Sequence, residues 1–169
     1  MARPFQRATG PESAQVELLE AGLDELSRRR SSRFCGHFWL KHAGAYRNDL
    51  WAVAYTVLGG CSDDCFADFR TWLVGCGRDR YERAPRQPDS LCEAFREIPA
   101  GEIPLLEWFL HVPFDRRFGE GSCDQAYAAF GFGLEQLLDP EHAWSHEDEG
   151  SISVLCPGVF SEFWGNGRF

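Results

Sequence analysis

The residues best suited to chemistry follow a double glycine, Gly59-Gly60, near the middle of the chain. Glycine lets the backbone approach a ligand closely, and a helix start offers free N–H groups. Carboxylates, a guanidinium and a thiol supply an acid, a base, an anion clamp and a nucleophile. The residues predicted to act in this way are Asp63, Asp64, Arg70 and Cys61.

Helix geometry limits how these groups can cooperate. Asp63 and Asp64 are adjacent, so their side chains project about 100° apart and only one can face the same ligand as Arg70. One carboxylate beside an arginine, against an aromatic wall, is therefore the favoured pocket. The residues predicted to bind substrate are Asp49, Trp51, Tyr55, Ser62 and Trp72.

A cysteine could also serve as a nucleophile. Cys61 stands at the mouth of a helix N-terminus, where the pKa of a thiol can be lowered. A base for it would have to come from elsewhere in the chain, and His37 or His42 is the candidate. Most of the seven cysteines are interpreted as buried thiols, because they are odd in number and spread through the chain.

The same segment has an equally complete structural explanation. Gly59 or Gly60 can end one helix, Ser62 can cap the next, and the two aspartates can offset the helix macrodipole. Arg70 would then pair with a carboxylate such as Asp49. The segment therefore forms either a catalytic or binding pocket or a part of the fold alone.

Potential metal ligands occur in pairs, but not in a recognised finger pattern. Structural zinc would require two pairs to converge, and a histidine pair would need a third ligand such as Glu147 or Glu149. We therefore predict neither a metal nor a cofactor. The pairs are Cys35 with His37, Cys61 with Cys65, and His142 with His146.

Apolar residues at three and four spacing predict the helices that position these groups. The second helix should bury Phe34, Phe38 and His42 on one face, and the third is apolar nearly all round and should be central. The segment 105–110 fits a strand or a short helix equally well. The predicted helices cover 13–29, 32–46, 48–58, 62–76, a short piece at 79–83, one starting near Asp89 or Ser90, and 122–138.

Length and composition predict one domain with a single core built largely of aromatic rings. It has 169 residues, of which 44% are hydrophobic and 14% aromatic. We predict an all-α or mainly α fold, a loose tail over 1–11, and a single helical domain over 12–169 with an irregular C-terminal segment. No secretory h-region or membrane-length apolar run occurs, so a cytoplasmic location is expected.

The net charge of −9 argues against coating nucleic acid. A local basic patch remains conceivable at Arg28, Arg29, Arg30 and Arg33, although at the end of the predicted helix 13–29 these arginines would complement the helix dipole. A polar or acidic small molecule or a peptide is the expected ligand, since arginine clamps carboxylates and phosphates well. A protein partner is the other option.

The stretches DLWAVAY, from Asp49 to Tyr55, and GGCSDDCFADFRTWL, from Gly59 to Leu73, resemble the hallmark of a bacterial family. This is the domain of unknown function forty-two-forty family, with the pattern DLW-x-AAY and GGCSDD-x-F-x-x-FR-x-WL. Pro88-Asp89-Ser90-Leu91 fits its PDSL element, and the region around Trp144 and Cys156-Pro157 resembles its closing segment more loosely. The resemblance implies a helical fold with the motif at 49–77, and no reaction.

Two functional hypotheses result. In the first, the protein is a small intracellular enzyme or ligand-binding protein, acting on a polar small molecule or peptide through a pocket around the GGCSDD helix start. In the second, it is a non-catalytic protein–protein interaction or regulatory module whose motif stabilises the fold.

Overall fold

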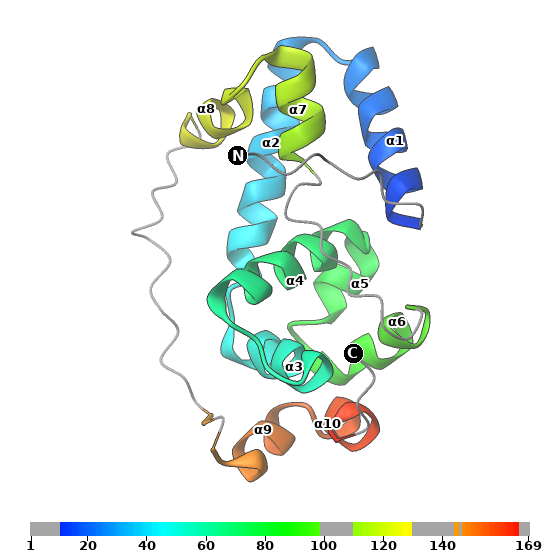
Figure 1. The fold of residues 1–169 in the computed structure, drawn as a ribbon, viewed down its shortest axis with the longest axis vertical. Helices are drawn as coiled ribbons and strands as arrows, with labels where there is room; N and C mark the ends of the chain where they lie inside the picture. Colours follow the sequence, from blue (N-terminus) through cyan, green and yellow to red (C-terminus); the bar gives the residue numbers. More distant parts are fainter. Residues whose placement is uncertain (1–10, 99–109, 130–143, 146, 166–169) are drawn as a thin grey trace, which may run out of the picture. The chain divides into compact units, whose positions relative to one another are not determined.

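The computed structural model describes residues 11–98, 110–129, 144–145 and 147–165 (Figure 1). These ranges contain ten α-helices, one 3-10 turn and no strand, which confirms the all-α prediction. None of these helices is long and apolar enough to cross a membrane. The elements are α1 (Pro11–Glu25), α2 (Arg28–Gly44), α3 (Asn48–Leu58), α4 (Asp63–Gly75), α5 (Arg78–Arg83), η1 (Pro88–Leu91), α6 (Cys92–Arg96), α7 (His111–Phe118), α8 (Ser122–Ala128), α9 (Glu149–Leu155) and α10 (Pro157–Phe163).

The chain divides into two compact units, one of residues 1–37 and 106–132 and the other of 38–105 and 133–169. The single helical domain over 12–169 stays a prediction. The first unit holds α1, the first half of α2, α7 and α8. The second holds the end of α2, then α3 to α6, α9 and α10.

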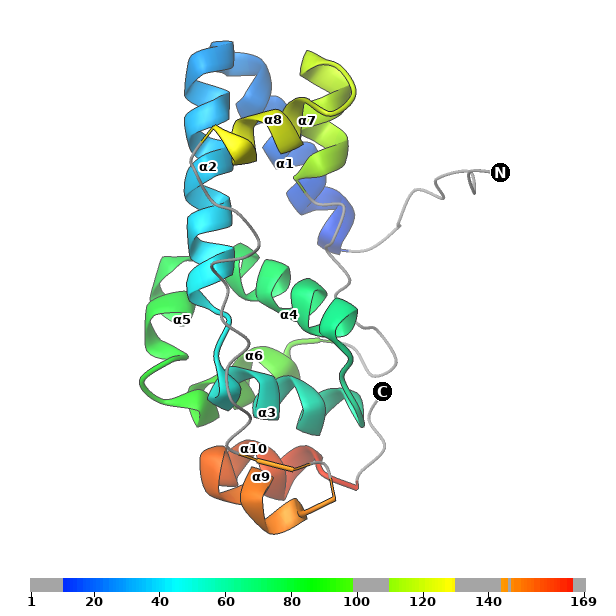
Figure 2. The same cartoon turned by 90° about the vertical axis from the view of Figure 1, so that its left-hand side faces the viewer.

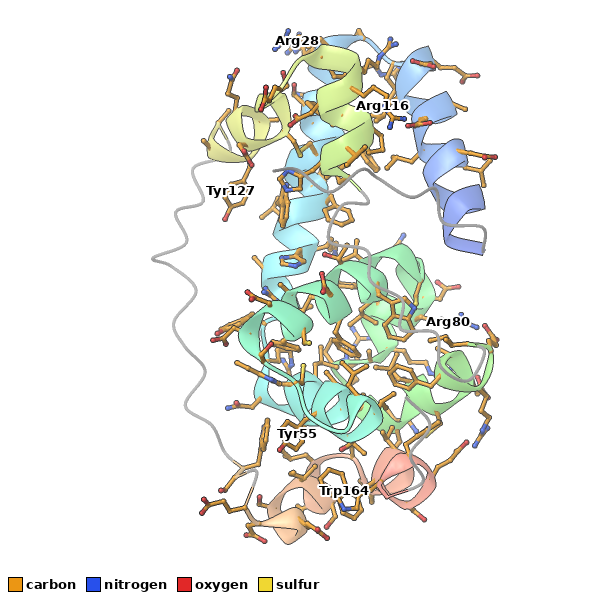
Figure 3. The ribbon with its side chains drawn as sticks, in the orientation of Figure 1. Arg28, Tyr55, Arg80, Arg116, Tyr127 and Trp164 are labelled. Carbon is orange, nitrogen blue, oxygen red and sulfur yellow. The ribbon has the colours of Figure 1, made fainter. Side chains whose placement is uncertain are left out.

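In the first unit, α7 lies alongside α1 and runs directly into α8 (Figures 1 and 2). Arg116 and Arg117 of α7 form ion pairs with Glu20 and Asp24 of α1, and Figure 3 shows Arg116 directed toward that helix. The carboxylate of Asp115 accepts hydrogen bonds from backbone N–H groups at the start of α8. Charged side chains of α7 therefore bind both α1 and the start of α8.

The boundary between the first two helices differs from the prediction. Helix α1 ends at Glu25 and α2 begins at Arg28, because the carbonyl of Ser27 accepts hydrogen bonds from the N–H groups of Arg30 and Ser31. The arginine run thus lies in the first turns of α2 and not at the end of a helix. There it adds positive charge to the positive end of the macrodipole.

The buried face of α2 agrees with the prediction at Phe38 and His42 but not at Phe34. Ser31, Cys35, Phe38 and His42 are buried, whereas Phe34 is 40% exposed. The small Ser31 and Cys35 occupy the positions facing the interior, so the predicted inward orientation of Phe34 was wrong. Phe34 was predicted to be buried because it is more hydrophobic than Cys35. The orientation of the helix instead places Cys35 on the inward face.

Helix α3 is the centre of the second unit, as predicted. It is buried over most of its length and has α4 on one side and α9 and α10 on the other (Figures 1 and 2). Gly59 ends the helix in the left-handed conformation, at φ 67°, which glycine adopts at little cost. Stacked rings extend the core from Trp51 on Phe66, with centroids 4.7 Å apart, to Trp72 on Phe95 at 4.9 Å.

The C-terminal part is more regular than expected, since it contains α9 and α10. Asp89, which together with Ser90 marks the predicted start of a helix, accepts a hydrogen bond from the backbone N–H of Val159 in the first turn of α10, at 2.9 Å. A Cβ on Gly158 would lie 2.9 Å from the Cγ of Asp89. The indole of Trp144 donates to the carbonyl of Asn48 at 3.1 Å. Hydrogen bonds to residues far away in the sequence therefore order the C-terminal part, whose own sequence shows only a weak helical pattern.

Several predictions fall outside the described residues. They concern the tail up to residue 10, the segment 105–109, the helix beyond residue 129, and the histidines His142 and His146. The short helix at 79–83 is confirmed as α5.

Candidate functional site at the start of α4

The start of α4 has the local structure that the sequence predicted. The hydroxyl of Ser62 accepts a hydrogen bond from the N–H of Cys65 at 3.4 Å, and Ser62 adopts extended backbone angles typical of an N-cap. Asp63 and Asp64 lie exposed in the first turn. At this end of a helix, carboxylates are stabilised by the macrodipole whether or not a ligand is present.

Arg70 lies further along the same helix and is buried, with 6% of its surface exposed. Its Nε donates to the carbonyl of Phe66 at 3.3 Å, and its Nη1 donates to the carbonyl of His42 at 3.4 Å. The guanidinium also lies over two rings, 4.8 Å from the centroid of Tyr46 and 5.2 Å from that of Phe66. Arginine stacks on aromatic faces in this way because the ring quadrupole attracts the cation.

His42 is the second polar group of this cluster. Its Nε2 lies 3.0 Å from the carbonyl oxygen of Ala67 and must donate the hydrogen bond, since a carbonyl only accepts. That leaves Nδ1 as the acceptor for Nη1 of Arg70, 3.4 Å away. Burial, and then the nearby charge of Arg70, lowers the pKa of His42 to about 3. The imidazole is therefore neutral at physiological pH, with its proton on Nε2.

Asp49 is not the partner of Arg70 that the structural interpretation expected. Its carboxylate accepts hydrogen bonds from Nε and Nη2 of Arg47 at 3.0 and 2.8 Å, and it also accepts from the N–H of Leu50. Asp49 is thus occupied at the start of α3. The sequence could not reveal the choice, because Arg47 and Arg70 offer the same guanidinium.

The thiol of Cys61 differs from its expected state. Burial, followed by the neighbouring Cys65, Asp68 and Asp63, raises the pKa of Cys61 to about 12. Lowering had been expected from the helix N-terminus, but desolvation outweighs that effect here. A thiol with so high a pKa stays protonated at neutral pH and is a poor nucleophile.

The aromatic residues predicted to line a pocket serve different parts of the second unit. The indole N–H of Trp51 donates to the carbonyl of Cys61 at 3.1 Å, which ties α3 to the loop before α4. Trp72 is buried against Phe95. Tyr55 faces the C-terminal part (Figure 3). Its ring lies 5.2 Å from that of Trp144.

Another cysteine and histidine pair was not anticipated. In the first unit, Sγ of Cys35 lies 3.3 Å from Sγ of Cys123, and both residues are fully buried. A hydrogen bond with Cys123, ahead of smaller effects, raises the pKa of His111. His111 therefore faces a thiol, whereas the sequence had pointed to His37 or His42. No group of three possible ligands in the described part of the chain could hold a metal ion.

Comparison with known proteins identifies the family of the chain. Residues 2–115 match the family described as protein of unknown function (DUF4240), and this covers more than half of the chain. The chain therefore belongs to this family. No curated protein and no solved structure matches it.

Proposed function

We propose that this DUF4240 protein is a non-catalytic protein–protein interaction module, and that the segment from Asp49 to Gly77 forms its structural core. The observation that supports this is the environment of Arg70, whose guanidinium is enclosed by aromatic rings and by His42. An anion clamp must reach solvent to take up a ligand. A guanidinium used inside the core cannot do so without local unfolding.

The surrounding groups support the same proposal. The indole of Trp51 and the hydroxyl of Ser62 make hydrogen bonds within the segment, and the carboxylate of Asp49 pairs with Arg47. Cys61 is held as a protonated thiol by its raised pKa. Asp63 and Asp64 remain exposed, but they lie where a helix favours carboxylates for stability alone. Each group then has a structural role that needs no substrate.

A thermal-shift screen with metals, nucleotides, amino acids and acidic metabolites tests this proposal. The variants are Arg70→Ala, Asp64→Asn and, as a control, Arg83→Ala at an exposed arginine of α5. We expect that no compound raises the melting temperature of the wild type, that Arg70→Ala melts several degrees lower, and that Arg83→Ala melts like the wild type.

The opposite result would favour the enzyme or small-ligand hypothesis. A metabolite that raises the melting temperature of the wild type, but not that of an equally stable Asp64→Asn variant, would locate a ligand at the start of α4. Such a result would overturn the proposal of an interaction module built on a purely structural core.

A further inference from the structure

The densest positive charge among the described residues lies at the start of α2. Arg28, Arg29 and Arg30 form its first turn, Arg33 follows in the next, and all are exposed. The whole helix, of 17 residues, contains no aspartate or glutamate. This is unexpected in a chain with 26 acidic and 17 basic side chains.

These arginines differ from most others in the parts of the chain that the structure describes. None of them forms an ion pair there, and Arg28 only lies over the ring of Phe118, 5.8 Å from its centroid. In the same unit, Glu20 and Asp24 pair with arginines of α7 and not with these four. The ion-paired arginines are Arg47, Arg78, Arg80, Arg96, Arg116 and Arg117.

The arrangement opposes the stability of the helix. Arg29 and Arg33 are four positions apart and Arg30 and Arg33 three, so their like charges repel across adjacent turns. Positive charge at a helix N-terminus also opposes the macrodipole. No ion pair among the described residues offsets these two effects, and a sequence that breaks local rules without such compensation usually does so for function.

The arginines share a face with an exposed aromatic ring. At about 100° per residue, Arg29, Arg33, Arg30 and Phe34 fall within an arc of about 140°. The buried residues Ser31, Cys35 and Phe38 lie on the opposite side of α2. We call the four residues on the exposed arc the α2 basic face.

We propose that the α2 basic face binds an acidic segment of a protein partner, with carboxylates on its arginines and an apolar side chain on Phe34. This rests on the proposed interaction module and specifies its partner. Arginine and aromatic residues are enriched in protein interfaces, and arginine binds carboxylates through two parallel hydrogen bonds. The net charge of −9 repels a long polyanion such as nucleic acid more strongly than a short segment that carries only a few carboxylates.

Fluorescence anisotropy with the full chain tests the proposal. The probe is a short fluorescein-labelled peptide of glutamates interrupted by one leucine, and its companion carries glutamine in place of glutamate. The test variant is Arg29→Gln with Arg33→Gln. The matched control is Arg83→Gln with Arg86→Gln, which removes the same charge from exposed arginines that form no ion pair in the described structure.

We expect the glutamate peptide to bind the wild type and the control variant alike, and to bind the α2 variant about tenfold more weakly. Binding should weaken with added salt, and the glutamine peptide should not bind. A third variant, Phe34→Ala, should weaken binding without changing its salt dependence.

Three outcomes would overturn the proposal: no binding of the glutamate peptide, equal loss in both charge variants, or tighter binding of a single-stranded oligonucleotide with the same net charge. The proposal of an interaction module is overturned by a different result, namely a metabolite that stabilises the wild type through Asp64. The two proposals can therefore fail separately.

Discussion

The α3–α4 segment and the start of α2 use the same residue type in opposite ways. In the first, Arg70 is buried, lies over two rings and donates to backbone carbonyls. In the second, Arg29 and Arg33 are exposed and form no ion pair within the described ranges. The motif that looks most chemical is occupied internally, whereas the plainer arginine run keeps its charge available. Burial and partners, and not residue type, indicate where a ligand can bind.

The largest effect should come from Arg70. We expect Arg70→Ala to lower the free energy of unfolding by about 3 to 5 kcal/mol, because a cavity opens and buried polar groups lose their partner. Arg70→Lys should restore little of it, since an ammonium lacks the planar fork. Urea unfolding measures both, with Arg83→Ala expected within about 0.5 kcal/mol of the wild type. If Arg70→Ala were as stable as that control, Arg70 would not be a core residue.

The pH dependence of stability should reveal His42. The pKa of His42 is about 3 in the folded chain, against 6.5 for an unperturbed histidine, which represents the unfolded chain. Between these pH values the unfolded state therefore binds the proton more readily. Stability should therefore fall as the pH drops, by about 2 kcal/mol between pH 8 and pH 5. His111, whose pKa is raised, contributes with the opposite sign.

Urea unfolding across this pH range separates the two histidines. His42→Gln should flatten the loss of stability on acidification, and His111→Gln should steepen it. An unchanged slope in His42→Gln would mean that the imidazole is accessible to protons in the folded chain.

A smaller effect tests how the second unit orders its C-terminal part. Asp89→Ala should cost about 1 kcal/mol, as expected for a lost helix cap. Gly158→Ala should cost about 1 to 2 kcal/mol, because its Cβ would lie 2.9 Å from Cγ of Asp89. In the double variant this clash disappears. Its loss of stability, measured by thermal unfolding, should therefore be smaller than the sum of the losses in the two single variants. Strict additivity would place the two residues apart.

Signals close in sequence gave the correct local structure. The bounds of α3, the left-handed Gly59 and the cap by Ser62 all follow from residues within a few positions of one another. These features depend on backbone angles and local hydrogen bonds, which neighbouring residues determine. The family, too, was identified correctly.

Contacts between residues far apart in the sequence could not be predicted from its helical periodicity. His42 and Arg70 are 28 positions apart, and Asp89 and Val159 are 70 apart. Helical period reports which face is buried but not which residue lies opposite. For that reason Arg70 was assigned to a ligand or to Asp49, and Phe34 was placed in the core.

The polar residues at the start of α4 should have modest effects. Ser62→Ala should lower the free energy of unfolding by about 0.5 to 1 kcal/mol, given one long cap hydrogen bond. Asp63→Asn and Asp64→Asn should each cost a few tenths of a kcal/mol, through the macrodipole alone. Thermal unfolding at low and high salt checks the assignment, because salt should erase the aspartate effects but not that of Ser62. A large gain in stability from either asparagine would point to a functional carboxylate.

The division of roles between the two segments is decided by the Arg29→Gln, Arg33→Gln variant, through its free energy of unfolding and its affinity for the glutamate peptide. We predict that stability is unchanged or rises by about 0.5 kcal/mol, since repulsion and the dipole conflict are relieved, while affinity falls about tenfold. A loss of stability above about 1 kcal/mol, or an unchanged affinity, would contradict the division of roles between the start of α2 and the α3–α4 segment.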